Sequence, residues 1–143
     1  MIILRLITSF FGVYGFSLMF NSPRKMAMTA GLIGMFANTL RLELIDLAHF
    51  PVGIAAFIGA FFTGCVASIV KKKIGYPRIS LTVPAIVIMV PGLYMYRGIY
   101  YIGLNEIGDG SLWLTKAILI VMALPMGLVA ARLCTDKNFR HCT

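Results

Sequence analysis

The chain has 143 residues, of which 59% are hydrophobic and 13% charged, and its mean hydropathy is +0.89. Soluble domains average about 45–50% apolar and about 25% charged residues, so this composition excludes a soluble globular domain. The formal net charge of +8 could suggest a nucleic-acid partner. The charges lie in the gaps between apolar runs, however, which is typical of membrane topology. We therefore expect a lipid bilayer around the chain and no nucleic acid.

The apolar runs predict an all-α polytopic membrane protein that forms a single transmembrane domain over residues 1–143. A membrane-spanning helix needs roughly 20 apolar residues, and about five such helices fit the chain. We expect them over residues 2–20, 26–47, 50–70, 80–104 and 112–133, with residues 134–143 as a polar tail. The first run lacks the basic start and small-residue cleavage site of a signal peptide, so we expect it to be a retained helix.

The distribution of charge predicts the orientation. With five spans, nine of the thirteen basic residues fall on one face of the membrane and four of the five acidic residues on the other. Basic residues concentrate in cytoplasmic loops. This predicts a multi-pass protein of the cell (inner or plasma) membrane with an outside N-terminus and a cytoplasmic C-terminal tail.

The fourth span is predicted to be broken at Pro91-Gly92. Thr82 is expected to cap its start, with Pro84 in the first turn, where a missing N–H costs nothing. Pro91 removes the hydrogen bond to the carbonyl of Val87, and Gly92 permits a turn that other residues make less readily. Non-helical backbone at this depth is tolerated only inside protein or beside a wet cavity.

Such a break predicts a substrate site. The second half-helix would point its N–H groups and positive dipole end at the midplane, which suits a carboxylate. Arg97 lies just over one turn further along, and a stripe of the second span carries Asn38 and Arg41. The residues expected to shape the site are Pro91, Gly92, Tyr94, Tyr96, Arg97, Asn38 and Arg41. The alternatives are a simple proline kink, snorkelling of both arginines to the surface, and their neutralisation by Glu43 or Glu106.

The third span carries small residues every four positions: Ala56, Ala60, Gly64 and Ser68. A neighbouring row holds Gly59, Thr63 and Ala67. Small residues mark faces where membrane helices approach closely. One interpretation is packing within this chain. The interpretation we favour is that two such faces exceed what five helices can use, so that one of them binds a partner subunit.

No catalytic set is visible, and the chain is not expected to be an enzyme or to need a cofactor. There is no nucleophile elbow, phosphate loop or paired-carboxylate spacing. Cys134, His141 and Cys142 offer at most three ligands in the tail, so we expect no metal site there, and the odd number of cysteines argues for free thiols.

Several segments resemble the threonine/serine exporter family. They are Phe20-Asn21-Ser22-Pro23-Arg24, the small-residue-rich second and third spans, and the stretch from Val90-Pro91-Gly92-Leu93 to Tyr94-Met95-Tyr96-Arg97-Gly98. The length and layout are similar to the small stand-alone membrane subunit of the YjjB type. The resemblance implies a larger membrane subunit as partner. It also implies export of threonine and serine, or of a dicarboxylate such as succinate, coupled to the proton gradient.

Two hypotheses follow. In the first, the chain is the membrane subunit of a two-component secondary exporter of small carboxylate-bearing metabolites, and Gly92→Leu abolishes export without affecting insertion. In the second, it is a non-transporting scaffold or regulatory subunit that holds a partner through its small-residue faces. A homo-oligomeric permease ranks last, because small exporters of that kind use an acidic residue in an early span, and none precedes Glu43.

Overall fold

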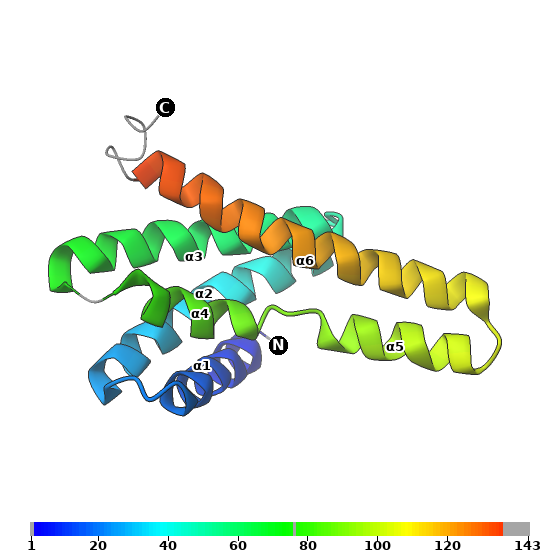
Figure 1. Cartoon of the computed structure of the whole chain (residues 1–143), viewed down its shortest axis with the longest axis horizontal. Helices are drawn as coiled ribbons and strands as arrows, with labels where there is room; N and C mark the ends of the chain where they lie inside the picture. The colour runs from blue at the N-terminus through cyan, green and yellow to red at the C-terminus, as the bar shows by residue number, and fades with distance from the viewer. Residues whose placement is uncertain (1, 76, 136–143) are drawn as a thin grey trace.

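The computed structural model describes residues 2–75 and 77–135, and this part of the chain consists of six helices and no strand (Figure 1). The candidate tail ligands His141 and Cys142 lie outside the described residues, as do the basic residues Lys137 and Arg140. The helices are α1 (Ile2–Met19), α2 (Arg24–Asp46), α3 (Val52–Ile74), α4 (Arg78–Val87), α5 (Gly92–Gly103) and α6 (Ile107–Thr135).

Proline marks the start of most of these helices. Pro23, Pro51, Pro77 and Pro91 each stand immediately before the first residue of α2, α3, α4 and α5. Proline has a fixed φ and disfavours helical geometry in the residue before it, so it separates two helices within a short connection. Gly75 ends α3 in a left-handed conformation with φ 80° and donates its N–H to the carbonyl of Lys71, as helix-terminal glycines commonly do.

The start of the fourth span differs from the prediction. Helix α4 begins after Pro77, so Thr82 lies inside the helix, where its hydroxyl donates to the carbonyl of Arg78 at 2.9 Å. Pro84 is an interior residue rather than a first-turn residue. The expectation for Thr82 and Pro84 was wrong because Pro77 already supplies a helix start one turn earlier.

The predicted all-helical membrane architecture with a broken fourth span is confirmed. Four segments are long and apolar enough to cross a membrane: α1, α3, the combined α4–α5 stretch Arg78–Gly103, and α6. Helix α2 is not among these four, although its 23 residues give it a length of about 35 Å. It packs against α1, α4 and α3, and three of the polar side chains that lower its hydropathy, Asn38, Glu43 and Asp46, bind side chains of α1.

The two small-residue rows of α3 are both used within the chain. Ala56, Ala60, Gly64 and Ser68 are buried. A Cβ on Gly64 would lie 2.6 Å from the Cβ of Ala131 in α6. The neighbouring row faces α2, since a Cβ on Gly59 would lie 3.3 Å from both the carbonyl oxygen of Ala37 and the Cβ of Arg41. The argument that two such faces require a partner is therefore wrong, because α6 and α2 cover one row each.

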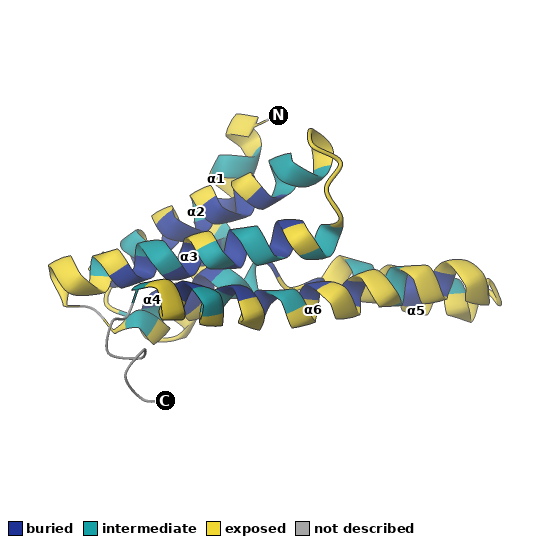
Figure 2. Ribbon diagram, turned by 90° about the horizontal axis from the view of Figure 1, so that it is seen from above, coloured by how far each residue is buried: buried dark blue, intermediate teal, exposed yellow. Residues whose placement is uncertain are grey.

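Helix α5 packs chiefly against α6, and it runs with the first half of α6 away from the other helices as a hairpin (Figures 1 and 2). Gly98 is the one buried residue of α5. A Cβ there would lie 2.7 Å from Leu114 Cγ and 3.2 Å from the carbonyl oxygen of Gly110. This close crossing fixes the register of the hairpin, while most of the remainder of α5 is exposed, with Tyr94 and Tyr101 half-buried.

The α3–α6 crossing generates a stability prediction. A Cβ on Gly127 would lie 2.6 Å from the carbonyl oxygen of Phe57, so Gly127→Ala should force the helices apart and lower stability by about 1–3 kcal/mol, the usual cost of overpacking. Gly15→Ala is the matched control, because a Cβ there meets nothing within 4 Å and alanine favours a helix interior. Thermal unfolding in detergent should rank Gly127→Ala below the wild type and Gly15→Ala at or above it. Equal unfolding temperatures for the two variants would contradict this packing.

Candidate functional site

The backbone between α4 and α5 leaves the helical path in two steps. The N–H groups of Met89 and Val90 donate to the carbonyls of Ile86 and Val87, at 2.8 and 3.2 Å, which tightens the end of α4 into a 3₁₀-type turn. Pro91, with φ −81° and ψ 50°, then forms an inverse γ-turn. In this turn, the N–H of Gly92 donates to the carbonyl of Val90 at 2.9 Å.

Gly92 does not supply special backbone freedom at this break. The one glycine with positive φ among the described residues is Gly75, and a Cβ on Gly92 would meet nothing within 4 Å. The turn is made by Pro91, whose conformation is available to any residue that tolerates a γ-turn. The expectation that Gly92 provides a turn others make less readily was therefore wrong.

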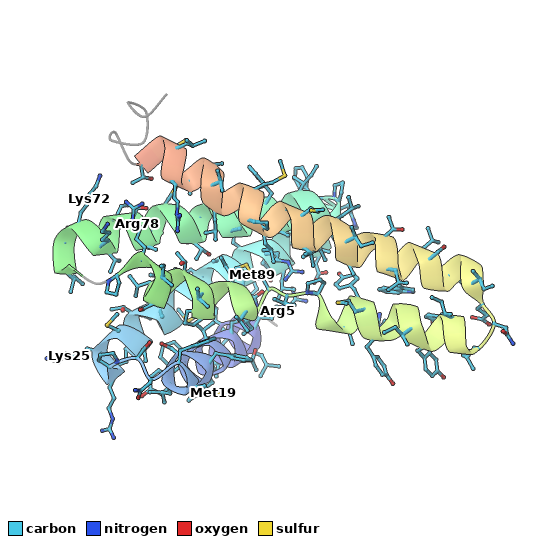
Figure 3. The ribbon with its side chains drawn as sticks, viewed as in Figure 1. Arg5, Met19, Lys25, Lys72, Arg78 and Met89 are labelled. Carbon is cyan, nitrogen blue, oxygen red and sulfur yellow. The ribbon has the colours of Figure 1, made fainter. Side chains whose placement is uncertain are left out.

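Arg41 of α2 reaches into the break. Its Nη1 donates to the carbonyl oxygen of Met89 at 3.1 Å, and Met89, labelled in Figure 3, is itself fully buried. A cation at the C-terminal end of a helix satisfies a free carbonyl and interacts favourably with the helix dipole. The break releases carbonyls of this kind, and the structure places the guanidinium of Arg41 at one of them.

The charge of Arg41 has no counter-ion in the part of the chain that the structure describes. The side chain is only 6% exposed, and its Nε is buried without a hydrogen-bond partner. Glu43, one of the two acids considered as its neutraliser, pairs instead with Arg5 of α1 at 3.3 Å, and Asp46 also binds Arg5. Burying a charged group without a partner for its charge is energetically costly. Arg41 is thus a buried cation that lacks an anion.

A cleft of about 320 Å³ opens beside Arg41 and the break. It brings together five of the seven predicted site residues, which come from α2, the break and α5. The cleft is lined by Asn38, Arg41, Leu42, Ile88, Val90, Pro91, Leu93, Tyr94, Arg97 and Trp113. Of the two predicted residues outside this lining, Gly92 is exposed, and Tyr96 lies on a second hollow of about 510 Å³ with Arg97, Tyr100 and Tyr101.

Trp113 of α6 is a lining residue that the sequence did not reveal. The guanidinium of Arg97 lies 4.9 Å from the centre of its ring, and the ammonium of Lys116 lies 5.0 Å from it. The ring of Tyr94 is 5.6 Å away. Cations are attracted to the face of an indole ring, so Trp113 holds Arg97 at the mouth of the cleft. The sequence held one indication of this contact. Arg97 and Trp113 each lie eight residues from Asn105 in the connection between α5 and α6, so a hairpin that turns at Asn105 brings them side by side.

Asn38 adds a hydrogen-bond acceptor to the cleft. Its Nδ2 donates to Ser9 Oγ of α1 at 2.9 Å, and its Oδ1 is buried with no partner in the described structure. Asn38 is 7% exposed and lies one turn before Arg41, on the same face of α2. The cleft therefore offers an unpaired acceptor beside an incompletely paired cationic donor.

The start of α5 contributes further donors. Its first helical bond runs from the N–H of Met95 to the carbonyl of Pro91, at 3.0 Å. The N–H groups of Leu93 and Tyr94 precede that bond and have no carbonyl of their own helix to donate to. Both residues line the cleft. Together with Arg41 and Arg97, these groups form an environment suited to a carboxylate.

The described residues hold no group of three or more His, Cys, Asp or Glu side chains that could bind a metal ion. Cys65 and Cys134 are free thiols in this part of the chain.

Comparison with known proteins gives two matches. A family model described as "Threonine/Serine exporter, ThrE" matches residues 5–134. A relative from Mycobacterium tuberculosis (strain ATCC 25618 / H37Rv), named "Probable threonine/serine exporter", is 28% identical over 109 residues, which is 76% of this chain. The chain spans 20% of that relative's length. No solved structure matches the chain significantly.

The geometry of the break predicts that Gly92→Ala is tolerated. The added Cβ meets no atom, and the backbone has no positive φ at this position, so unfolding temperature and transport should both stay at wild-type levels. Gly98→Ala is the contrasting variant, because its Cβ would collide with Leu114 and displace the adjacent Arg97. Thermal unfolding and export measured on both variants test this. Loss of either property in Gly92→Ala would show that the break does require glycine.

Proposed function

The chain belongs to the threonine/serine exporter family, and from this premise we propose that it binds the substrate of a two-component secondary exporter of small carboxylate-bearing metabolites. The substrate is threonine or serine, or a dicarboxylate such as succinate. The single observation that supports this proposal is the buried, uncompensated Arg41 in a cleft at a helix break.

The proposed binding step follows from the charges of the cleft. A substrate carboxylate enters past Arg97 and accepts hydrogen bonds from Arg41 and from the first N–H groups of α5. The substrate thereby supplies the anion that the chain does not provide. Charge-assisted hydrogen bonds of this kind are roughly twice as strong as neutral ones. Pro91 shapes the backbone of the site, and Tyr94 and Trp113 form its aromatic wall.

We propose a larger membrane subunit of the same family as the partner. Two observations support it: the chain spans 20% of the relative's length, and α5 packs chiefly against α6 and is otherwise mostly exposed. We also propose coupling to the proton gradient. No aspartate, glutamate or histidine lines the cleft as the structure describes it, so the proton-carrying group belongs to the partner in this proposal.

The proposed location is the cell (inner or plasma) membrane, with the N-terminus outside and the C-terminus in the cytoplasm. Lys25, Lys72 and Arg78 lie toward one end of the molecule in Figure 3. Glu43 and Asp46 bind Arg5 near the opposite end of α2. Cytoplasmic loops carry the excess of basic residues, which supports this orientation.

The scaffold alternative has less support in the structure. It assigned partner binding to the row Ala56, Ala60, Gly64 and Ser68, and this row is buried within the chain. The described residues show no feature that favours a non-transporting role as strongly as the cleft favours substrate binding.

Replacement of the two cleft arginines tests the substrate site. Arg41→Met should lower export of threonine, serine or succinate from loaded cells about tenfold or more, because it removes a charge-assisted hydrogen bond worth about 1.5–3 kcal/mol. Arg97→Leu should also lower export, because it removes the positive charge past which the substrate enters. Arg24→Met, on the exposed first turn of α2, is the control and should export normally. The amount of each variant in the membrane and its unfolding temperature are measured in parallel. Arg97 is exposed, so its replacement should leave the fold intact. Wild-type export by both cleft variants would refute the site.

Production of the two proteins separately and together in cells tests the two-component arrangement. Loaded cells that produce this chain alone, a larger membrane protein of the same family alone, or both together are compared for efflux of threonine, serine and succinate. Export only by cells with both proteins is the expected result. Export by this chain alone would contradict the need for a partner, and the absence of export in all three would contradict the proposed function for these substrates.

A further inference from the structure

The cleft is lined by two incompletely paired side chains of opposite hydrogen-bonding character on one face of α2. Arg41 presents donors, and the Oδ1 of Asn38 is an acceptor with no partner in the described structure. The two side chains lie three residues apart, so they are neighbours along the helix, about 4.5 Å apart in axial rise. Both are more than nine-tenths buried.

The orientation of the Asn38 amide is held from the other side. Its Nδ2 donates to Ser9 Oγ at 2.9 Å, and Ser9 is 2% exposed. The nitrogen is engaged by α1, the oxygen has no partner in the described structure, and Asn38 lines the cleft. A buried acceptor without a partner carries a desolvation penalty. That penalty is removed when a ligand brings a donor to it.

We propose that Asn38 is the specificity-determining residue of the cleft, and that its Oδ1 selects carboxylates with an ammonium or hydroxyl donor near the carboxylate. This inference rests on the proposed function and decides between the substrate classes left open there. Threonine and serine carry both donors. Succinate at neutral pH has only acceptor oxygens, which cannot donate to Oδ1 and leave it unpaired.

The expected discrimination follows from that mismatch. A site built to hydrogen-bond a polar group rejects an analogue that lacks the group, because its own buried polar atom stays unpaired. Arg41 binds the carboxylate of either substrate, so it contributes affinity without distinguishing between them. Asn38 contributes the difference in affinity between the two substrate classes.

The next residue of α2 supplies a matched control. Thr39 is also buried, at 6% exposure, and its Oγ1 has no partner in the described structure. It faces a different hollow, which is lined by apolar side chains such as Ile2, Leu6 and Phe36. Thr39→Val therefore removes an unpaired buried oxygen from the same turn of the same helix without changing the cleft.

The test measures the ratio of threonine efflux to succinate efflux in cells that contain equal amounts of both. The cells produce the chain together with a larger membrane protein of the same family. Asn38→Leu should lower this ratio about tenfold, with succinate efflux unchanged or raised, and a tenfold change corresponds to about 1.4 kcal/mol. Asn38→Ala, which adds no bulk, should lower the ratio in the same direction if Asn38→Leu does not reach the membrane. Thr39→Val should keep the wild-type ratio.

The outcomes separate the two proposals. A wild-type ratio in both Asn38 variants, with export intact and dependent on Arg41, would overturn the role of Asn38 and leave the exporter function standing. A lowered ratio in Thr39→Val as well would overturn it too, because the effect would then not be specific to the cleft. Absence of any export by the wild-type chain would overturn the proposed function itself.

Discussion

The hydrogen bond from Arg41 to the carbonyl oxygen of Met89 joins the break of the fourth span to the central helix, and the rest of the site depends on it. Inside a bilayer no water satisfies a backbone carbonyl that has lost its helical partner. Arg41 meets that need at the end of α4, but it brings a charge that the described chain does not neutralise. This one interaction thus stabilises the broken backbone and also leaves a buried positive charge that an anion would neutralise.

The packing of small residues is what lets Arg41 reach the break. Gly59 allows α3 to approach α2 so closely that a Cβ there would lie 3.3 Å from the Cβ of Arg41. On its other face α3 meets α6 through Gly64 and Gly127. In lipid such close backbone contacts replace the hydrophobic effect as the force between helices. The glycines of α3 therefore bear on the site through the position they give to α2 and α6, without lining the cleft.

The sequence predicted those features of the site that depend on local chemistry. Pro91 lacks the N–H that would bond to the carbonyl of Val87, and Asn38 and Arg41 must share a face at a spacing of three. Features that depend on which helices meet were not predictable in this way. Trp113 contacts Arg97 only because α5 and α6 form a hairpin, and Glu43 is paired because the start of α1 lies beside the end of α2. The role given to Gly92 failed for a further reason: an inverse γ-turn at Pro91 changes the chain direction with a negative φ.

A cleft of this composition has consequences for transport under the proposed function. A buried guanidinium without an anion is costly, so the empty cleft is the least favourable state of the site. Substrate binding lowers that cost, and release restores it unless water or a partner group reaches Arg41. The site therefore favours a change of conformation when the substrate leaves. The backbone at the break is suited to take up such a change, because between Val87 and Gly92 it is held by short-range turns rather than by a continuous helix.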